Sequence, residues 1–271
     1  MKLGVFITLG DEVAPKMRQL RELGFETCML SCWDPALFTD EYAEMVKRAS
    51  AETGVEVSAV WAGWYGGPGI WDFISGPSTL GMVPPAYRQK RSEQFLAGAD
   101  FAYRIGVTDV ITHVGFMPEN PHDPDYIGTI AMLRYIAGIL KERGQYFLFE
   151  TGQETPVVLL RAIEDIGTGN IGINLDTANL ILYGKANPVD ALDVFGKYVR
   201  NTHMKDGCYP TDGRHLGRET PLGEGKVDFP ALIVKLKALG YTGPLTIERE
   251  ISGEQQLHDI LAAKAMLEKL L

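Results

Sequence analysis

The fold is decided by residues 146–176, which read YFLFETGQETPVVLLRAIEDIGTGNIGINLD. The short apolar run Tyr146–Glu150 predicts a strand, Thr155–Ile166 predicts a helix, and Ile171–Leu175 predicts a second strand. Each of the two strands leads directly to an acidic residue. A strand, a helix and a strand in this order predict two parallel strands joined by a crossover helix.

The same strand–helix unit recurs along the whole chain of 271 residues. The predicted strands are Leu3–Thr8, Thr27–Leu30, Val55–Trp61, Asp109–Thr112, Tyr146–Glu150, Ile171–Leu175, Tyr198–His203 and Leu245–Glu248. The predicted helices are Val13–Leu23, Asp40–Thr53, Ser92–Ile105, Asp125–Arg143, Thr155–Ile166, Val189–Phe195, Phe229–Leu239 and Gln255–Leu270.

Eight alternating units predict the α/β class and a single (β/α)8 TIM barrel over residues 1–271, with active-site loops near residues 62–91 and 206–227. An open, doubly wound sheet is the alternative. It has little support as a nucleotide-binding fold, because no Gly-x-Gly-x-x-Gly motif follows the first strand.

Charge and composition limit the partners and the compartment. The formal net charge of −9 disfavours nucleic acid and anionic membranes, because both would repel an acidic surface. No apolar segment approaches the roughly 20 residues that span a bilayer. The three cysteines, Cys28, Cys32 and Cys208, are an odd number in a chain that needs no disulfides, so we expect reduced thiols in a cytoplasmic protein.

Four predicted strands end in residues of metal-ligand type, namely Glu150, Asp176, His203 and Glu248. The first three are spaced by 26 and 27 residues, one strand–helix unit each, and the last follows after 45 because of the loop Asp206–Lys226. In a parallel barrel the carboxyl ends of all strands open on one face, so these four side chains should meet there. Any one of them alone is more often a solvated loop residue or a helix cap.

Three carboxylates and one imidazole favour a catalytic divalent cation over a structural zinc site, which prefers sulfur ligands. We expect Mn²⁺ first, with Mg²⁺, Co²⁺ or Zn²⁺ as alternatives. Such an ion can polarise a ketone and stabilise the enediolate that forms when the neighbouring carbon loses its proton. The reaction also needs a base and an acid, and Glu150 and Glu248 are the natural pair.

The context of these residues resembles the sugar-phosphate isomerase/epimerase superfamily, the xylose-isomerase-like TIM barrels, over nearly the whole chain. The similarity is strongest in Phe149–Glu154, Asn174–Asn179, Thr202–Asp206, Pro221–Phe229 and Ile247–Glu250. The ketose 3-epimerase branch of this superfamily uses two metal-bound glutamates as its acid/base pair. The resemblance therefore implies these roles for Glu150 and Glu248, with Asp176 and His203 completing the metal shell.

Three further substrate contacts are suggested by the same comparison. Arg218 matches a substrate-contacting arginine of the epimerase branch, although it can equally be a solvated loop charge. Glu154 can hydrogen-bond a sugar hydroxyl or serve only as a helix N-terminal charge. Asn179 stands where ketose epimerases and the endonuclease branch have a histidine, which removes a ligand of a trinuclear zinc cluster and leaves the epimerase assignment open.

Other candidates at the predicted barrel mouth are His113, Trp61 with Trp64, and Lys205. His113 follows the fourth strand and can contact substrate or be a satisfied core histidine. Trp61 can form an apolar wall for a sugar ring or simply pack in the core. Lys205 can bind a carbonyl or phosphate oxygen, or pair with Asp206 or another carboxylate at the mouth.

The leading functional hypothesis is a metal-dependent isomerase or epimerase acting on a ketose or keto-sugar through an enediolate. The alternative is a lyase of the same superfamily, a dehydratase or deglycosidase in which the enediolate expels a β-substituent. Less favoured are an abasic-site endonuclease and a metal-free sugar-binding barrel. The expected partner is a small sugar, with neither nucleic acid nor membrane, and relatives imply a homodimer or homotetramer.

Overall fold

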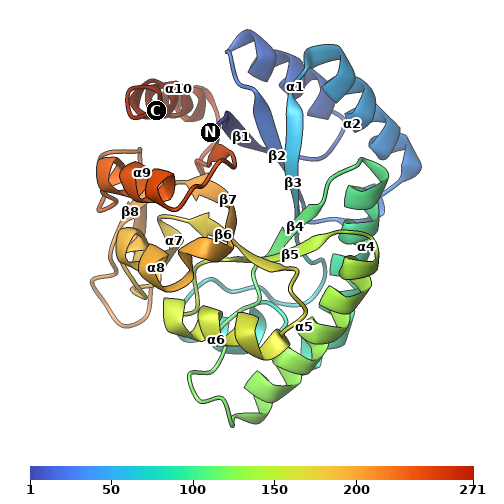
Figure 1. Ribbon diagram of the computed structural model, residues 1–271, viewed down its shortest axis with the longest axis vertical. Helices are drawn as coiled ribbons and strands as arrows, with labels where there is room; N and C mark the ends of the chain where they lie inside the picture. Colours follow the sequence, from blue (N-terminus) through green and yellow to red (C-terminus); the bar gives the residue numbers. More distant parts are fainter.

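Eight parallel strands close into a barrel in the computed structural model, which describes residues 1–271 (Figure 1). Around the ring, neighbouring strands follow the order β1, β10, β7, β6, β5, β4, β3 and β2. Their bounds are β1 Leu3–Thr8, β2 Thr27–Cys32, β3 Glu56–Ala62, β4 Asp109–Thr112, β5 Tyr146–Glu150, β6 Ile171–Asp176, β7 Val199–Met204 and β10 Leu245–Ile247. The predicted TIM barrel is thereby confirmed.

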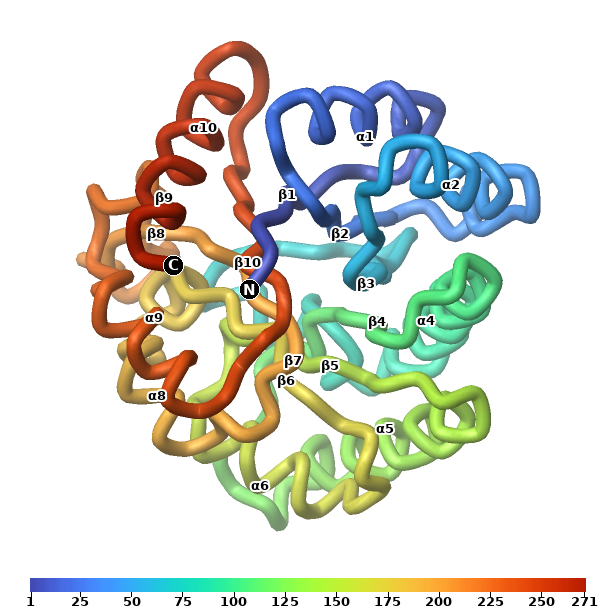
Figure 2. Tube along the Cα trace, turned by 45° about the horizontal axis from the view of Figure 1, so that its top comes forward, coloured from blue at the N-terminus to red at the C-terminus, as the bar shows by residue number.

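The helices surround the barrel, and the two chain ends lie near each other beside β1 and α10 (Figure 2). The longer helices are α1 Val13–Glu22, α2 Asp40–Thr53, α4 Pro85–Arg104, α5 Pro124–Glu142, α6 Pro156–Ile166, α8 Pro188–Phe195, α9 Phe229–Ala238 and α10 Glu254–Glu268. Short helical turns occur at η1 Pro35–Leu37, α3 Gly76–Thr79, α7 Asn179–Leu182 and η2 Gly196–Tyr198. None of the helices is sufficiently long and apolar to traverse a bilayer.

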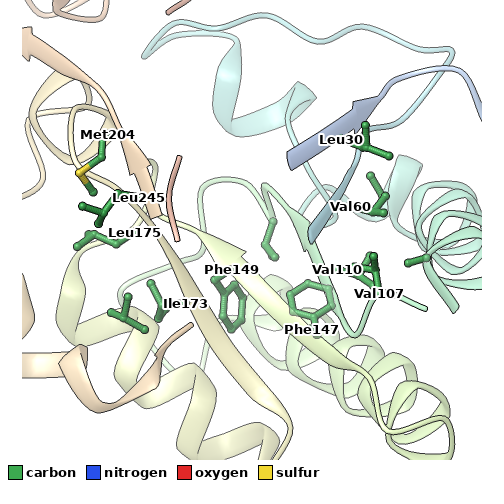
Figure 3. Packing of buried hydrophobic residues seen from close by; sticks show 14 of the residues in the cluster. Leu30, Val60, Val107, Val110, Phe147, Phe149, Ile173, Leu175, Met204 and Leu245 are labelled. Atoms are coloured by element: carbon green, nitrogen blue, oxygen red, sulfur yellow. The ribbon is translucent and has the colours of Figure 1, made fainter. Parts of the chain in front are cut away.

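Alternation along the strands separates the outer core from the barrel interior. On β5, Phe147 and Phe149 belong to the large core between the barrel and the helices (Figure 3). Leu148 instead joins a small interior cluster with residues of β2, β3 and β4. Because side chains alternate with a period of two, Glu150 lies on the same inner side as Leu148. On β6, Ile173 and Leu175 pack outward, so the same alternation directs the side chain of Asp176 inward. Burial of the apolar positions therefore turns the polar strand ends inward.

The segment after β3 differs from the predicted loop near residues 62–91, because α4 begins at Pro85. Pro85 occupies the first position of α4, where proline is favoured. The first turns of the helix are polar, so no apolar period indicates a helix before Ser92. The inward position of these turns is filled by Arg91, which is 2% exposed and donates to the carbonyl oxygens of Thr79 (2.8 Å) and Gly81 (2.6 Å). Arg91 thus ties the loop after β3 to helix α4.

The loop after β7 contains a short antiparallel pair, β8 Asp206–Cys208 and β9 Arg218–Thr220. The buried Asp206 carboxylate accepts hydrogen bonds from four backbone N–H groups, and the donors with their distances are Gly207 (2.8 Å), Gly223 (2.9 Å), Gly225 (2.9 Å) and Val227 (3.1 Å). One side chain therefore closes the predicted loop near residues 206–227 upon itself.

We predict that Asp206→Asn lowers the free energy of unfolding by about 1–3 kcal/mol. The Asn amide group replaces an acceptor by a donor, so it faces backbone N–H groups that it cannot satisfy. Denaturant unfolding measures the change. Asp212→Asn is the matched control, because Asp212 lies in the same loop, is exposed and accepts from only two backbone N–H groups. Equal losses in both variants would contradict this account of Asp206.

Candidate active site

The structure brings Glu150, Asp176, His203 and Glu248 together at the carboxyl end of the barrel. One ligand atom from each lies within 4.8 Å of the others, and all four side chains are buried. Nδ1 of His203 is 2.9 Å from Oε1 of Glu150, 3.1 Å from Oε2 of Glu248 and 3.7 Å from Oδ2 of Asp176. Strand register explains the meeting, since His203 pairs with Asp176 on β6 and with Thr246 on β10.

The donor set fits a divalent cation. Oδ2 of Asp176 and Oε2 of Glu248 are buried and accept no hydrogen bond, so both are available as ligands. Three carboxylates and one imidazole match the hard oxygen and nitrogen ligands of Mn²⁺ or Mg²⁺. These four residues are the ones that would hold the ion.

Burial and neighbouring charges act against each other on the pKa values of this cluster. Burial raises the pKa of Asp176 to about 7 despite the nearby Lys205. Burial acts to lower the pKa of His203, but Glu150 and Glu248 raise it well above its ordinary value. In the same way, burial acts to raise the pKa of Glu248, while Lys205 and His203 bring it well below its usual range. A nearby positive charge therefore stabilises the ionised form of these buried carboxylates.

Neighbouring groups orient the four side chains. Nε1 of Trp61 donates to Oε2 of Glu150, and the backbone N–H of Asn179 donates to Oδ1 of Asp176 at 2.7 Å. The second nitrogen of His203 lies 2.9 Å from Sδ of Met29, which leaves Nδ1 directed at the carboxylates. Sequence reasoning missed Met29, because a methionine within a buried strand carries no signal of a polar contact.

Lys205 is buried beside the cluster and pairs with carboxylates of the mouth. Its ammonium group is 2.7 Å from Oε1 of Glu250, 3.5 Å from Oε2 of Glu248 and 3.7 Å from Oδ2 of Asp176. Its partner is therefore not Asp206, whose carboxylate is occupied by the backbone of its own loop. Burial acts to lower the pKa of Lys205, but the three carboxylates raise it well above its usual value. Lys205 is thus a charged partner of the acidic cluster.

A cavity of about 430 Å³ opens above the cluster. Among the predicted site residues, its wall contains Glu150, Glu248, Trp61, His113 and Asn179. Nε2 of His113 is 4.0 Å from Oε1 of Glu150, and burial lowers the pKa of His113, so its ring is neutral near pH 7. The cavity also borders Trp33 and Trp71, two residues not identified from the sequence.

The position of Trp33 at the mouth could have been predicted from the period of the preceding strand. Met29 and Ser31 lie on β2, and Trp33 directly follows that strand in the same period of two, which directs its side chain to the mouth. The predicted strand ended at Leu30, three residues too early for the series to be followed. No comparable periodicity covers Trp71, which lies in an irregular loop.

Three of the predicted substrate contacts lie away from the cavity wall, namely Lys205, Arg218 and Glu154. Arg218 is exposed on β9. Glu154 is only 1% exposed, and neither of its carboxylate oxygens has a hydrogen-bond partner. Burial raises the pKa of Glu154 from its ordinary 4.5 to about 8, with Lys185 acting in the opposite direction. The roles of all three residues stay predictions.

We predict that Lys205→Met lowers the melting temperature of the metal-free protein, because the buried carboxylates of Glu248 and Asp176 lose their counter-charge. Breaking a buried ion pair typically costs about 3–5 kcal/mol. Added Mn²⁺ should then raise the melting temperature of this variant more than that of the wild type, because the ion replaces the lost charge. Thermal unfolding with and without Mn²⁺ measures both effects.

The control is Lys235→Met, since Lys235 pairs with the exposed Asp193 on the outer surface at 2.6 Å. Its response to Mn²⁺ should equal that of the wild type. The prediction is wrong if Mn²⁺ raises the melting temperatures of Lys205→Met and wild type equally.

We also predict that Glu154 makes stability depend on pH between its ordinary 4.5 and about 8. In that window the folded protein keeps a proton that the unfolded chain has released, so the free energy of unfolding falls as the pH rises, by at most about 1.4 kcal/mol per pH unit. Glu154→Gln cannot titrate and should show a shallower fall in denaturant unfolding at pH 5–8. The exposed Glu164→Gln should keep the wild-type slope; identical slopes in all three proteins would refute the assignment.

Comparison with known proteins identifies the family. Residues 17–270 match the model of the xylose isomerase-like TIM barrel family. The structure is similar to that of a xylose isomerase domain protein from Planctomyces limnophilus, with 34% identity, a TM-score of 0.92, and coverage of 99% of this chain and 96% of that one. The fold, at 20% identity and a TM-score of 0.71, is also that of the 3-keto-D-glucoside 4-epimerase of E. coli, with 99% of each chain covered.

Among curated proteins, an uncharacterised protein of Methanocaldococcus jannaschii is 26% identical over 181 residues, which cover 63% of this chain and 58% of that protein. Further structures with the same fold include D-psicose 3-epimerases and a probable dehydratase from Bacillus anthracis. The resemblance found in the sequence is confirmed: the chain belongs to the xylose isomerase-like TIM barrel family.

Proposed function

We propose that this protein is a divalent-metal-dependent isomerase or epimerase that moves a proton next to the carbonyl of a ketose or keto-sugar. One observation carries the proposal. Glu150 and Glu248 come from strands that are not neighbours, yet both face the imidazole of His203 and both border the same cavity. A substrate in that cavity would have one carboxylate available for removing a proton and another for returning it.

The chain's own residues supply the acid and the base. A cation held by Glu150, Asp176, His203 and Glu248 supplies Lewis-acid polarisation of the substrate carbonyl when bound. One glutamate takes the proton from the carbon beside the carbonyl, and the other delivers a proton to the opposite face of that carbon. The substrate passes through an enediolate, and its configuration at that carbon is inverted. Trp61 keeps the carboxylate of Glu150 in place through its N–H group.

Proteins of the same fold support this chemistry by analogy. They include the 3-keto-D-glucoside 4-epimerase, ketose 3-epimerases, and a xylose isomerase-like protein of Mycobacterium smegmatis in complex with magnesium. These likenesses are below 25% identity, so for this chain they establish the fold alone. The proposal rests on the geometry of Glu150 and Glu248.

A lyase is the second candidate, because the same base and the same enediolate serve an elimination. The probable dehydratase of Bacillus anthracis has this fold at 18% identity and a TM-score of 0.72. A cavity of about 430 Å³ also leaves room for a leaving group beside the sugar. Isomerisation and elimination differ only in what the enediolate does next.

We predict that Glu150→Gln and Glu248→Gln each reduce turnover by roughly 10²–10⁴-fold, since each removes one of the two proton-transfer groups. Ketoses and 3-keto-glycosides would be incubated with Mn²⁺-loaded protein in deuterated water and followed by NMR. Deuterium in a rearranged sugar indicates isomerisation, and an unsaturated product or released aglycone indicates elimination.

Glu164→Gln on the outer surface of α6 is the control and should keep wild-type turnover. Melting temperatures establish that all variants are folded. Full turnover in folded Glu150→Gln and Glu248→Gln proteins would show that these glutamates are not the acid and the base.

A further inference from the structure

All four tryptophans of the chain gather on one side of the active-site mouth. Ring centroids of Trp33 and Trp61 are 4.7 Å apart, those of Trp33 and Trp64 are 5.4 Å apart, and those of Trp64 and Trp71 are 6.2 Å apart. Trp61 lies on β3, Trp33 directly follows β2, and the other two occupy the loop after β3. Residues from two strands and a loop thus form a single aromatic cluster.

Exposure rises with distance from the acidic cluster. Trp61 donates to Glu150 and is 3% exposed, whereas Trp33 is 42% exposed and Trp71 is 40% exposed. Both outer rings border the cavity that Glu150 and Glu248 also border. Two large aromatic rings left open at the wall of a cavity indicate a surface that a ligand covers.

The outer rings are held in place before any ligand arrives. A Cβ atom on Gly63 would lie 2.7 Å from the six-membered ring of Trp33, so only glycine lets that ring pack against the chain. Trp71 stacks on Trp64 with an interplanar angle of 25°. Trp64 in turn lies under the guanidinium of Arg91, 4.9 Å from its ring. The rings of Trp33 and Trp71 are therefore fixed before a ligand binds, which lowers the entropic cost of binding a ligand ring against them.

The cavity has the size of a small-molecule site. Its volume of about 430 Å³ lies within the range of roughly 300–1,000 Å³ typical of pockets for small ligands. Glu150 and Glu248 line the cavity from its buried side, at 2% and 7% exposed, whereas Trp33 and Trp71 line it from the solvent side, at 42% and 40% exposed. Both rings are therefore open to a group that projects from the buried glutamates toward solvent.

We propose that Trp33 and Trp71 form a subsite for a second ring, joined by a glycosidic bond to the sugar that reacts at Glu150 and Glu248. The substrate class is then a keto-glycoside rather than a free ketose, an assignment that rests on the proposed function. The second ring is an aryl group or another sugar, because both present a flat face that stacks on an indole. Gln256 and Arg249 border the same cavity and offer hydrogen bonds to hydroxyl groups of either ring.

Binding of three unreactive glycosides to the Mn²⁺-loaded protein tests the subsite. Methyl β-D-glucoside has no second ring, phenyl β-D-glucoside has an aryl ring, and cellobiose has a second sugar ring. Isothermal titration calorimetry should show phenyl glucoside, cellobiose or both binding about tenfold more tightly than methyl glucoside. The preferred probe identifies which kind of ring the subsite takes.

Variants distinguish the loss of stacking on the two tryptophans from a general loss of glycoside binding. Trp33→Ala and Trp71→Ala should abolish the preference for a second ring while changing methyl glucoside binding less than about threefold. Trp33→Phe keeps a flat ring and should retain most of the preference. Gly63→Ala removes no aromatic group, but its methyl group displaces the Trp33 ring, so it should also lose the preference. Tyr135→Ala, which removes an exposed ring on α5, should bind all three probes like the wild type.

The proposal is overturned if wild-type protein binds methyl glucoside as tightly as both two-ring probes, or binds none of the three. It is also overturned if Trp33→Ala, Trp71→Ala and Gly63→Ala all keep the wild-type preference. None of these readouts requires turnover. A protein that shows the ring preference but exchanges no proton with any keto-sugar would contradict the proposed function while supporting the subsite.

Discussion

Negative charge buried at the barrel mouth is the constraint on which the rest of the structure depends. Glu150, Asp176 and Glu248 are almost completely shielded from water, and removing an ion from water costs several kcal/mol even after the protein relaxes. His203 and Lys205 provide positive charge beside these carboxylates, and N–H groups of Trp61 and Asn179 donate hydrogen bonds to two of them. A fold that tolerates such a cluster must hold it rigidly, which the closed barrel does by hydrogen-bonding every strand to two neighbours.

The mouth is divided into two chemically different halves. Strands β5, β6 and β7 and the end of β10 supply the carboxylates and the imidazole of the cluster, whereas β3, the end of β2 and the loop after β3 supply the tryptophans. Trp61 joins the halves, because it belongs to the aromatic cluster and donates to Glu150. A bound molecule would therefore meet acid/base chemistry at one end and apolar stacking at the other.

Two buried charged side chains outside the acidic cluster organise the long loops that frame this mouth. The Arg91 guanidinium donates to backbone carbonyl groups of the loop after β3 and has no carboxylate partner. The Asp206 carboxylate accepts from backbone N–H groups of the loop after β7. In both loops a single side chain replaces the regular hydrogen-bond ladder that strands and helices have, so long irregular segments keep a defined shape.

The order of strands and helices can be predicted from the sequence alone. The period of the apolar residues indicates which face of each element is buried, and glycines mark where helices end. The sequence also predicts that Glu150, Asp176, His203 and Glu248 meet, since each lies at or directly after the carboxyl end of a strand and parallel strands of a barrel all open on one face. Only the tertiary structure decided where loop residues lie. It brought Trp71 to the cavity, left Arg218 exposed, buried Glu154 without a partner and placed Met29 against His203. These contacts join residues far apart in the chain, and their distances depend on loop path and strand register, which no local periodicity encodes.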